Sequence, residues 1–263
     1  ERAGERAAEL TQQAIVETCE ASRLRDVPAI LSAAIREANA RVYREACRER
    51  RRSGMSSTAA VAAIVEARLF VATAGDSRVY LVRNGRAIQL TRDHTWGEEA
   101  LRAGRLSPEA EAHHPRRADL VRSVGLAPEI APDTRLCLEA SNPQRADVDG
   151  RSGLPLQPGD AVLIATDGLS KERPASAHRH FVEREDLPGL VRGRGAEEAA
   201  RALVSKAVER GTDDNVSVVV MLPSPRRSLL GAVRRARSVG AGGLAALLVL
   251  GGALVGVRGW PQR

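Results

Sequence analysis

Apolar residues between positions 54 and 94 fall into four short runs separated by polar breaks. The runs cover residues 59–65, 69–74, 79–82 and 87–90. Asn84-Gly85 separates the last two, and Asn-Gly between two β-rich runs is the strongest short-range hairpin signal. The pattern therefore predicts four consecutive antiparallel strands.

Helical spacing of apolar residues marks three other segments. Residues 1–22 predict a surface helix, and Pro28 opens a second amphipathic helix over 29–47, since proline is favoured in a first turn. Residues 196–210 form the third such pattern, and they lead into an apolar run at 216–220. Strands and helices thus follow one another in an α+β arrangement.

Three aspartates lie next to apolar runs that predict strands. Asp76 follows the second run, Asp167 follows the run 161–166, and Asp214 adjoins the run 216–220. An unpaired buried carboxylate is costly, so Asp76 needs either a metal ion or Arg78 as its partner, unless it lies in an ordinary tight turn. Carboxylate oxygens on rigid strand ends are the ligands that hard divalent cations require.

Composition narrows the class of protein. A chain of 263 residues can form one main domain of roughly 200–250 residues. Aromatic residues make up 2%, so the core must consist of Val, Leu, Ile and Ala. The net charge is +7, but the basic residues are not interleaved with aromatic residues as they are in proteins that bind single-stranded nucleic acid. This argues against nucleic acid as a partner. Three scattered cysteines without CxxC spacing predict a reducing compartment, with neither disulfides nor a zinc site.

The segment 239–257 carries no charge and is long enough to cross a bilayer as a helix. Arginines crowd its N-terminal side, which by the positive-inside rule predicts a single-pass anchor in the cell membrane with the preceding domain in the cytoplasm. A buried core helix is the alternative. The predicted organisation is a domain at 1–222, a basic linker at 223–238, a transmembrane helix at 239–257 and a tail at 258–263.

Five segments in order along the chain resemble the metal-dependent protein serine/threonine phosphatases (the PPM family, type 2C), above all bacterial members. They are GMSST, ATAGDSRVYLVRNGRAIQLTRDH, LRAGRLSPEA, LQPGD followed two residues later by LIATDGLS, and GTDDNVSVVV. The resemblance implies an α+β fold, a four-layer αββα sandwich of two antiparallel sheets flanked by helices. It also implies a pair of Mn²⁺ or Mg²⁺ ions at one end, with a third, weaker ion in bacterial members.

The resemblance also implies roles for particular residues. Asp167 and Asp214 match the late ligands of the paired metals, and Asp76 matches the aspartate that shares the third metal with Asp167. Asp213 is not the match, because it would point to the opposite face of a strand. Four further residues support these motifs: Gly75, Ser77, Gly168 and Asn215.

Residues 91–125, called the flap below, match a long insertion of the kind that usually serves as a lid or recognition element. Five arginines there are candidates for contact with a phosphopeptide: Arg102, Arg105, Arg116, Arg117 and Arg122. His94 is interpreted as structural. The pair His113-His114 allows a metal site or a structural role at a helix end, and the structural role is favoured because adjacent histidines point in different directions.

The implied reaction is hydrolysis of phosphoserine and phosphothreonine in proteins by a metal-activated water, without a side-chain nucleophile. The implied partners are phosphoproteins, namely serine/threonine kinases and their substrates. The alternative is a catalytically inactive, membrane-tethered binding or scaffold module that keeps the same fold.

Departures from the family pattern lie mainly at the beginning of the chain. The family's phosphate-holding arginine and its metal-bridging Asp-Gly motif are absent before Gly4-Glu5, and the chain starts with glutamate. We expect a truncated N-terminus, weak metal binding by this chain alone, and an open sheet edge with exposed backbone donors. Lys171 also departs from the acidic segment that the family usually has there.

Overall fold

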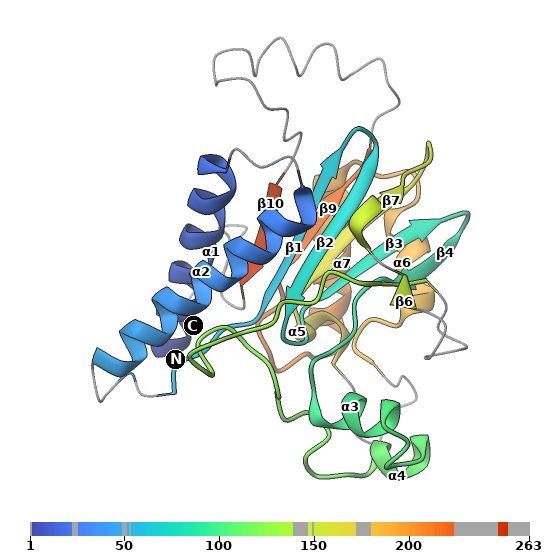
Figure 1. Cartoon of the computed structure of the whole chain (residues 1–263). Coiled ribbons are helices and arrows are strands. Elements are labelled where there is room, and N and C mark those ends of the chain that lie inside the picture. The colour runs from blue at the N-terminus through green and yellow to red at the C-terminus, as the bar shows by residue number, and fades with distance from the viewer. Residues whose placement is uncertain are drawn as a thin grey trace.

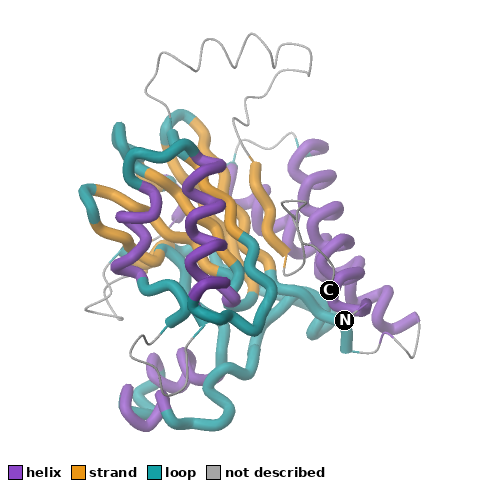
Figure 2. The backbone as a smooth tube through the Cα atoms, turned by 180° about the vertical axis from the view of Figure 1, so that it is seen from behind, coloured by secondary structure: helices purple, strands orange, loops and turns teal. Residues whose placement is uncertain are grey.

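The computed structural model describes residues 2–22, 26–48, 52, 54–138, 147–148, 150–171, 180–223 and 247–251. Two antiparallel sheets lie face to face, with helices against their outer surfaces (Figures 1 and 2). The predicted α+β class, with two antiparallel sheets flanked by helices, is confirmed.

The first sheet has the strand order β10-β1-β2-β7. Its long hairpin pairs Ala59–Val65 (β1) with Arg68–Ala74 (β2), and Leu154–Pro155 (β7) adds to β2. Glu66 and Ala67 at the hairpin tip both have positive φ, which a two-residue turn between twisted strands requires.

The second sheet has the order β4-β3-β8-β9. Its strands are Arg78–Arg83 (β3), Arg86–Gln89 (β4), Ala161–Ala165 (β8) and Val218–Met221 (β9). Asn84 and Gly85 connect β3 to β4 with φ of 52° and 72°, so the predicted Asn-Gly hairpin is confirmed.

The four predicted strands all exist, but they do not form one continuous meander. β1 and β2 belong to one sheet, whereas β3 and β4 belong to the other. The junction Gly75–Ser77 therefore carries the chain from one sheet to the next instead of reversing it within a sheet. Apolar runs of this kind do not show which sheet each strand joins, because β1, β2 and β3 are all buried on both faces.

Helices cover the two outer surfaces. Arg2–Ala21 (α1) and Val27–Arg48 (α2) lie against the first sheet, while Leu187–Val191 (α6) and Ala196–Glu209 (α7) lie against the second (Figure 1). The three long helices that the apolar spacing predicts are thus confirmed. The remaining short α-helices and strands are Trp96–Arg102 (α3), Pro108–Ala112 (α4), Asp167–Ser170 (α5), Leu136–Cys137 (β5) and Asp147–Val148 (β6).

Alternation along the strands produces three apolar layers. In β1, Ala59, Val61 and Ala63 face α1 and α2, while Ala60 and Ala62 face the second sheet. The strand β8 divides its side chains in the same way between the sheet interface and α7. The layer between the sheets contains mainly aliphatic residues: Ala60, Ala62, Leu69, Val71, Val79, Leu81, Leu90, Leu136, Val162, Ile164 and Met221.

The segment predicted as a C-terminal helix contains a strand at its centre. Leu247–Gly251 (β10) is a strand that pairs antiparallel with β1, so the outer edge of β1 is covered rather than open. A short apolar run suits a strand as well as a helix, and an unpaired sheet edge favours the strand. The rest of 239–257, the linker from 224 and the tail lie outside the described residues. Among those described, no helix has both the length and the hydropathy to cross a membrane.

Candidate metal centre

Asp76 lies in the junction between the two sheets, and close contacts fix the turn that carries it. Gly75 has a φ of 115°, and a Cβ there would come within 2.5 Å of Thr58 Cγ2. Only glycine fits that position without displacing the chain. The hydroxyls of Thr58 and Ser77 lie 2.8 Å apart and join the start of β1 to the same turn.

Asp167 and Asp214 lie next to β8 and β9, two neighbouring strands of the second sheet. Asp167 is the first residue of α5, directly after β8. Asp214 lies in the loop before β9 rather than on a strand, so the sequence argument that separated it from Asp213 by strand alternation does not apply. The distinction between the two rests on burial instead: the Asp213 side chain is 76% exposed and that of Asp214 is 38% exposed.

Backbone contacts hold the two segments together. A Cβ on Gly168 would lie 2.4 Å from the carbonyl oxygen of Asn215, so the chains approach too closely for a side chain. The Thr166 hydroxyl donates to that same carbonyl at 3.1 Å and accepts from the Ser217 N–H at 3.0 Å. Asp167 and Asp214 therefore stand on adjoining, firmly connected backbone.

Electrostatics joins the three aspartates into one group. Burial raises the pKa of Asp76 to about 7, with further contributions from the negative charges of Asp167 and Asp93. Burial and then the charge of Asp214 raise the pKa of Asp167. Carboxylates that repel one another in a partly buried site are stabilised by a cation.

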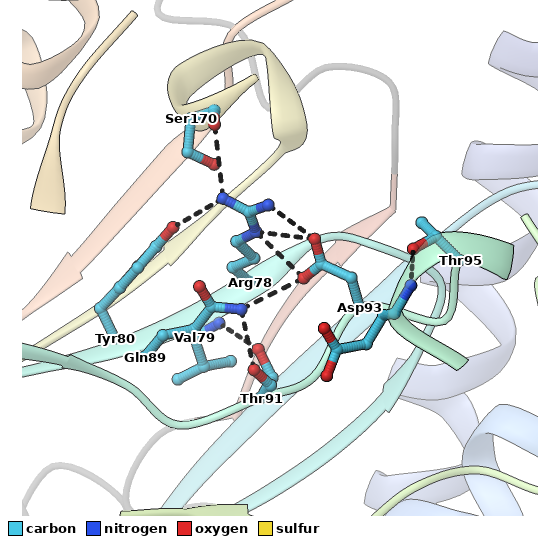
Figure 3. A network of polar contacts seen from close by, with 9 residues as sticks. Arg78, Val79, Tyr80, Gln89, Thr91, Asp93, Thr95 and Ser170 are labelled. Atoms are coloured by element: carbon cyan, nitrogen blue, oxygen red, sulfur yellow. Dashed lines mark hydrogen bonds and ion pairs between the residues drawn. The ribbon is translucent and has the colours of Figure 1, made fainter. Parts of the chain in front are cut away.

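Arg78 is not the partner of Asp76. Its guanidinium makes a bidentate ion pair with Asp93, at 2.6 Å from Nη2 to Oδ2, and it also donates to Tyr80 Oη and to the Ser170 carbonyl (Figure 3). The same guanidinium lines a cavity of about 330 Å³. Of the two partners that the sequence allows for Asp76, the arginine is therefore committed elsewhere.

Lys171 is a further member of the site that the sequence indicated only as a departure from the family pattern. Its Nζ lies 3.5 Å from Asp214 Oδ2 and 3.8 Å from Asp213 Oδ1. Burial opposes its charge, but Asp214 and then Asp213 raise the pKa of Lys171. In the sequence, the position of Lys171 four residues after Asp167 was the feature that could have indicated its place in the site.

The donors in this site are carboxylates, which match Mn²⁺ and Mg²⁺ in hardness. Among the described residues, however, no three His, Cys, Asp or Glu side chains already form a set close enough to hold an ion. Mg²⁺-type sites commonly use one or two carboxylates and complete their coordination with water and substrate phosphate. The residues present thus fit a divalent ion in chemistry and in charge, as an open site rather than a closed cage.

The flap projects from this end of the molecule and carries α3 and α4 (Figure 1). Trp96 stacks on His114 with ring centroids 4.2 Å apart, and Arg116 lies 5.6 Å from the Trp96 ring. His113 Nδ1 lies 2.9 Å from the Glu109 carbonyl oxygen at the end of α4. Both histidines therefore have the structural role that the sequence favoured over a metal site.

The flap arginines are distributed over different places. Arg102 ends α3, Arg105 follows that helix, and Arg116 pairs with Asp119 at 2.8 Å. Arg122 lies at the base of the flap, with Nη1 3.0 Å from His94 Nε2. The fifth, Arg117, accepts with its carbonyl the N–H of Gly97, again at the base.

Comparison with known proteins agrees with this fold. The family model described as protein phosphatase 2C matches residues 1–100. The serine/threonine phosphatase stp of Listeria welshimeri is 30% identical over 219 residues, which are 83% of this chain and 77% of that protein. The protein phosphatase PhpP of Streptococcus pneumoniae is 31% identical over 168 residues, covering 64% of this chain and 58% of PhpP.

Solved structures give the same result. The Mycobacterium tuberculosis serine/threonine phosphatase PstP/Ppp superposes with a TM-score of 0.64 and 28% identity, covering 83% of this chain and 81% of that one. The catalytic domain of PstP in complex with two manganese ions has a TM-score of 0.61 at 28% identity, covering 83% and 80%. The chain belongs to the protein phosphatase 2C family.

Proposed function

We propose that this protein hydrolyses phosphoserine and phosphothreonine in proteins with the help of divalent metal ions. The observation that carries the proposal is the group of Asp76, Asp167 and Asp214 at one end of the two sheets. Burial and mutual repulsion raise the pKa of Asp76 and of Asp167, and Arg78 is paired with Asp93. Such a group is suited to binding cations.

Asp167 and Asp214 would hold a pair of Mn²⁺ or Mg²⁺ ions, and Asp76 together with Asp167 would hold a third. When bound, paired divalent ions make hydroxide available near neutral pH and offset charge on the phosphoryl oxygens. The chain's own contribution is to fix its carboxylates on rigid backbone through Gly75, Gly168 and Thr166. Family relatives that are named phosphatases support this assignment.

The first test is hydrolysis of a phosphothreonine peptide as a function of Mn²⁺. We expect activity that a chelator abolishes and added Mn²⁺ restores, measured both for this chain and for a form extended upstream to an in-frame methionine. Activity in the extended form alone would agree with the predicted need for an upstream Asp-Gly motif. Absence of activity in both forms, with phosphopeptide binding retained, would favour the inactive binding module.

We also propose that the protein is attached to a membrane and acts on phosphoproteins there. The uncharged run at 239–257 and the arginines before it support a single-pass anchor with the phosphatase domain in the cytoplasm. The substrates would then be phosphoproteins produced by serine/threonine kinases at that membrane. The pairing of Leu247–Gly251 with β1 is the competing placement of the same segment.

A cut after Met221 separates these two placements. If the segment is an anchor, the full chain sediments with membranes and the shortened chain stays in the supernatant. Detergent extraction, but not high salt, should release the full chain, because a spanning helix is not held by surface charge alone. Membrane sedimentation of the shortened chain, or solubility of both, would contradict the anchor.

A further inference from the structure

We infer that His94 is a positioning residue for the candidate metal centre: it fixes the turn that carries Asp76 and joins this turn to the base of the flap. The inference rests on the proposed function and deepens it. His94 is buried, with 6% of its side chain exposed, and it lies outside the group of candidate ligands.

His94 holds both backbone polar groups of Gly75. The ring Nδ1 of His94 accepts the Gly75 N–H at 3.0 Å, and the backbone N–H of His94 donates to the Gly75 carbonyl at 3.0 Å. Gly75 directly precedes Asp76 and has a φ of 115°, so the turn is tight and unusual. Two bonds from one residue leave little freedom for the peptide that leads into the Asp76 side chain.

The other side of the ring faces charged groups. A neutral imidazole has one acceptor nitrogen, so acceptance at Nδ1 places the proton on Nε2. The protonated Nε2 can donate toward Asp133 Oδ2, which lies 3.8 Å away, but it makes no hydrogen bond with Arg122, whose Nη1 lies 3.0 Å away and is itself only a donor. Burial opposes the charge of Asp133, but hydrogen bonds from His94 and Arg135 hold the pKa of that carboxyl well below its usual range. Asp133 is itself fixed to β2 by two backbone bonds to Thr73.

His94 also stands where the flap begins and ends. Its carbonyl accepts the N–H of Val121, and the next residue, Thr95, forms an antiparallel bridge with Leu120. The two ends of the flap therefore meet at His94. One residue consequently connects β2, the junction turn and both ends of the flap, so displacement of the flap is transmitted to Asp76 through Gly75.

Replacements of His94 can separate these contacts. Asparagine keeps an acceptor at the place of Nδ1 and loses the contacts of Nε2, whereas glutamine extends its polar atoms toward Nε2 and loses the acceptor at Nδ1. His94→Gln should raise the Mn²⁺ concentration for half-maximal activity about tenfold or more, the usual cost of losing a group that orients a ligand. His94→Asn should stay close to the wild type.

Mn²⁺ titration calorimetry gives a readout independent of turnover, and thermal melting measures general damage. Thr91→Val is the matched control, because the buried Thr91 hydroxyl accepts the Val79 N–H of β3 at 3.0 Å, a bond of the same kind from a backbone N–H to a buried side chain. It should lower the melting temperature without changing the Mn²⁺ requirement.

An unchanged Mn²⁺ requirement in His94→Gln would overturn the inference while leaving the proposed function intact. An equal rise in His94→Asn, His94→Gln and Thr91→Val would also overturn it, since that result indicates general destabilisation. If the wild-type protein neither binds Mn²⁺ nor hydrolyses phosphopeptide, the proposed function itself fails, and this inference fails with it.

Discussion

Asp167→Asn is expected to abolish phosphopeptide hydrolysis, and Asp214→Asn to do the same. Both replacements keep the shape of the side chain but remove the negative charge that holds a divalent ion. We expect a loss on the order of a hundredfold or more, because even residues that only support a metal ligand cost 10–100-fold when replaced. The measurement is the initial rate on a phosphothreonine peptide over a range of Mn²⁺ concentrations.

Asp213→Asn is the matched control for Asp214→Asn. It removes the same charge from the neighbouring residue, which is 76% exposed and also lies near Lys171. Activity close to that of the wild type is expected. If Asp213→Asn were as damaging as Asp214→Asn, the choice of Asp214 over Asp213 would be contradicted, and near-normal turnover in Asp167→Asn would contradict the candidate metal centre.

Asp76→Asn should change stability and activity in opposite directions. The pKa of Asp76 is about 7 in the folded chain, far above the ordinary value near 4 that applies when unfolded. Between these values the folded state binds more protons than the unfolded state, so the free energy of unfolding falls as the pH rises. The stabilisation is complete below about pH 4 and lost above pH 7, on the order of 2–4 kcal/mol.

With chelator present at pH 8, Asp76→Asn should therefore melt higher than the wild type by about 5 °C or more. The same variant should need more Mn²⁺ for activity, with a milder loss than Asp167→Asn, because Asp76 is proposed to hold only the third ion. Melting curves at pH 4.5, 6 and 8, with chelator and with Mn²⁺, measure both effects. A lower melting temperature at pH 8 would show that burial of this carboxylate is compensated in the metal-free fold.

Local pattern predicted the elements of this fold well. The hairpin at Asn84-Gly85, the three long helices and the strand content all follow from spacing and turn chemistry that act within a few residues. The distribution of β1–β4 between two sheets depended on contacts between distant parts of the chain. The placement of Leu247–Gly251 beside β1 also depended on such distant contacts, since an apolar run does not show which strand it will pair with.

Part of the candidate site could likewise be predicted from sequence and part could not. Three aspartates beside apolar runs could be identified because an unpaired buried charge is energetically unfavourable. The partner of Arg78 could not be predicted from sequence, since Asp93 lies 15 residues away and is brought to Arg78 only by the β3–β4 hairpin. The connection from His94 to Gly75 likewise depends on a chain reversal that no short motif encodes, and the position of Asp214 in a loop removed the alternation argument used to select it.

The crossing of the chain between sheets at Gly75–Ser77 gives the pairing of β3 with β8 an indirect role in the chemistry. Asp76 stands two residues before β3, and Asp167 stands two residues after β8. These strands pair antiparallel with Arg78 opposite Ala165, so the same register carried two residues further brings Asp76 beside Asp167. The hydrogen bonds between β3 and β8 therefore set the spacing of these two carboxylates, and a one-residue slip of β3 would move Asp76 away from Asp167 without changing any candidate ligand.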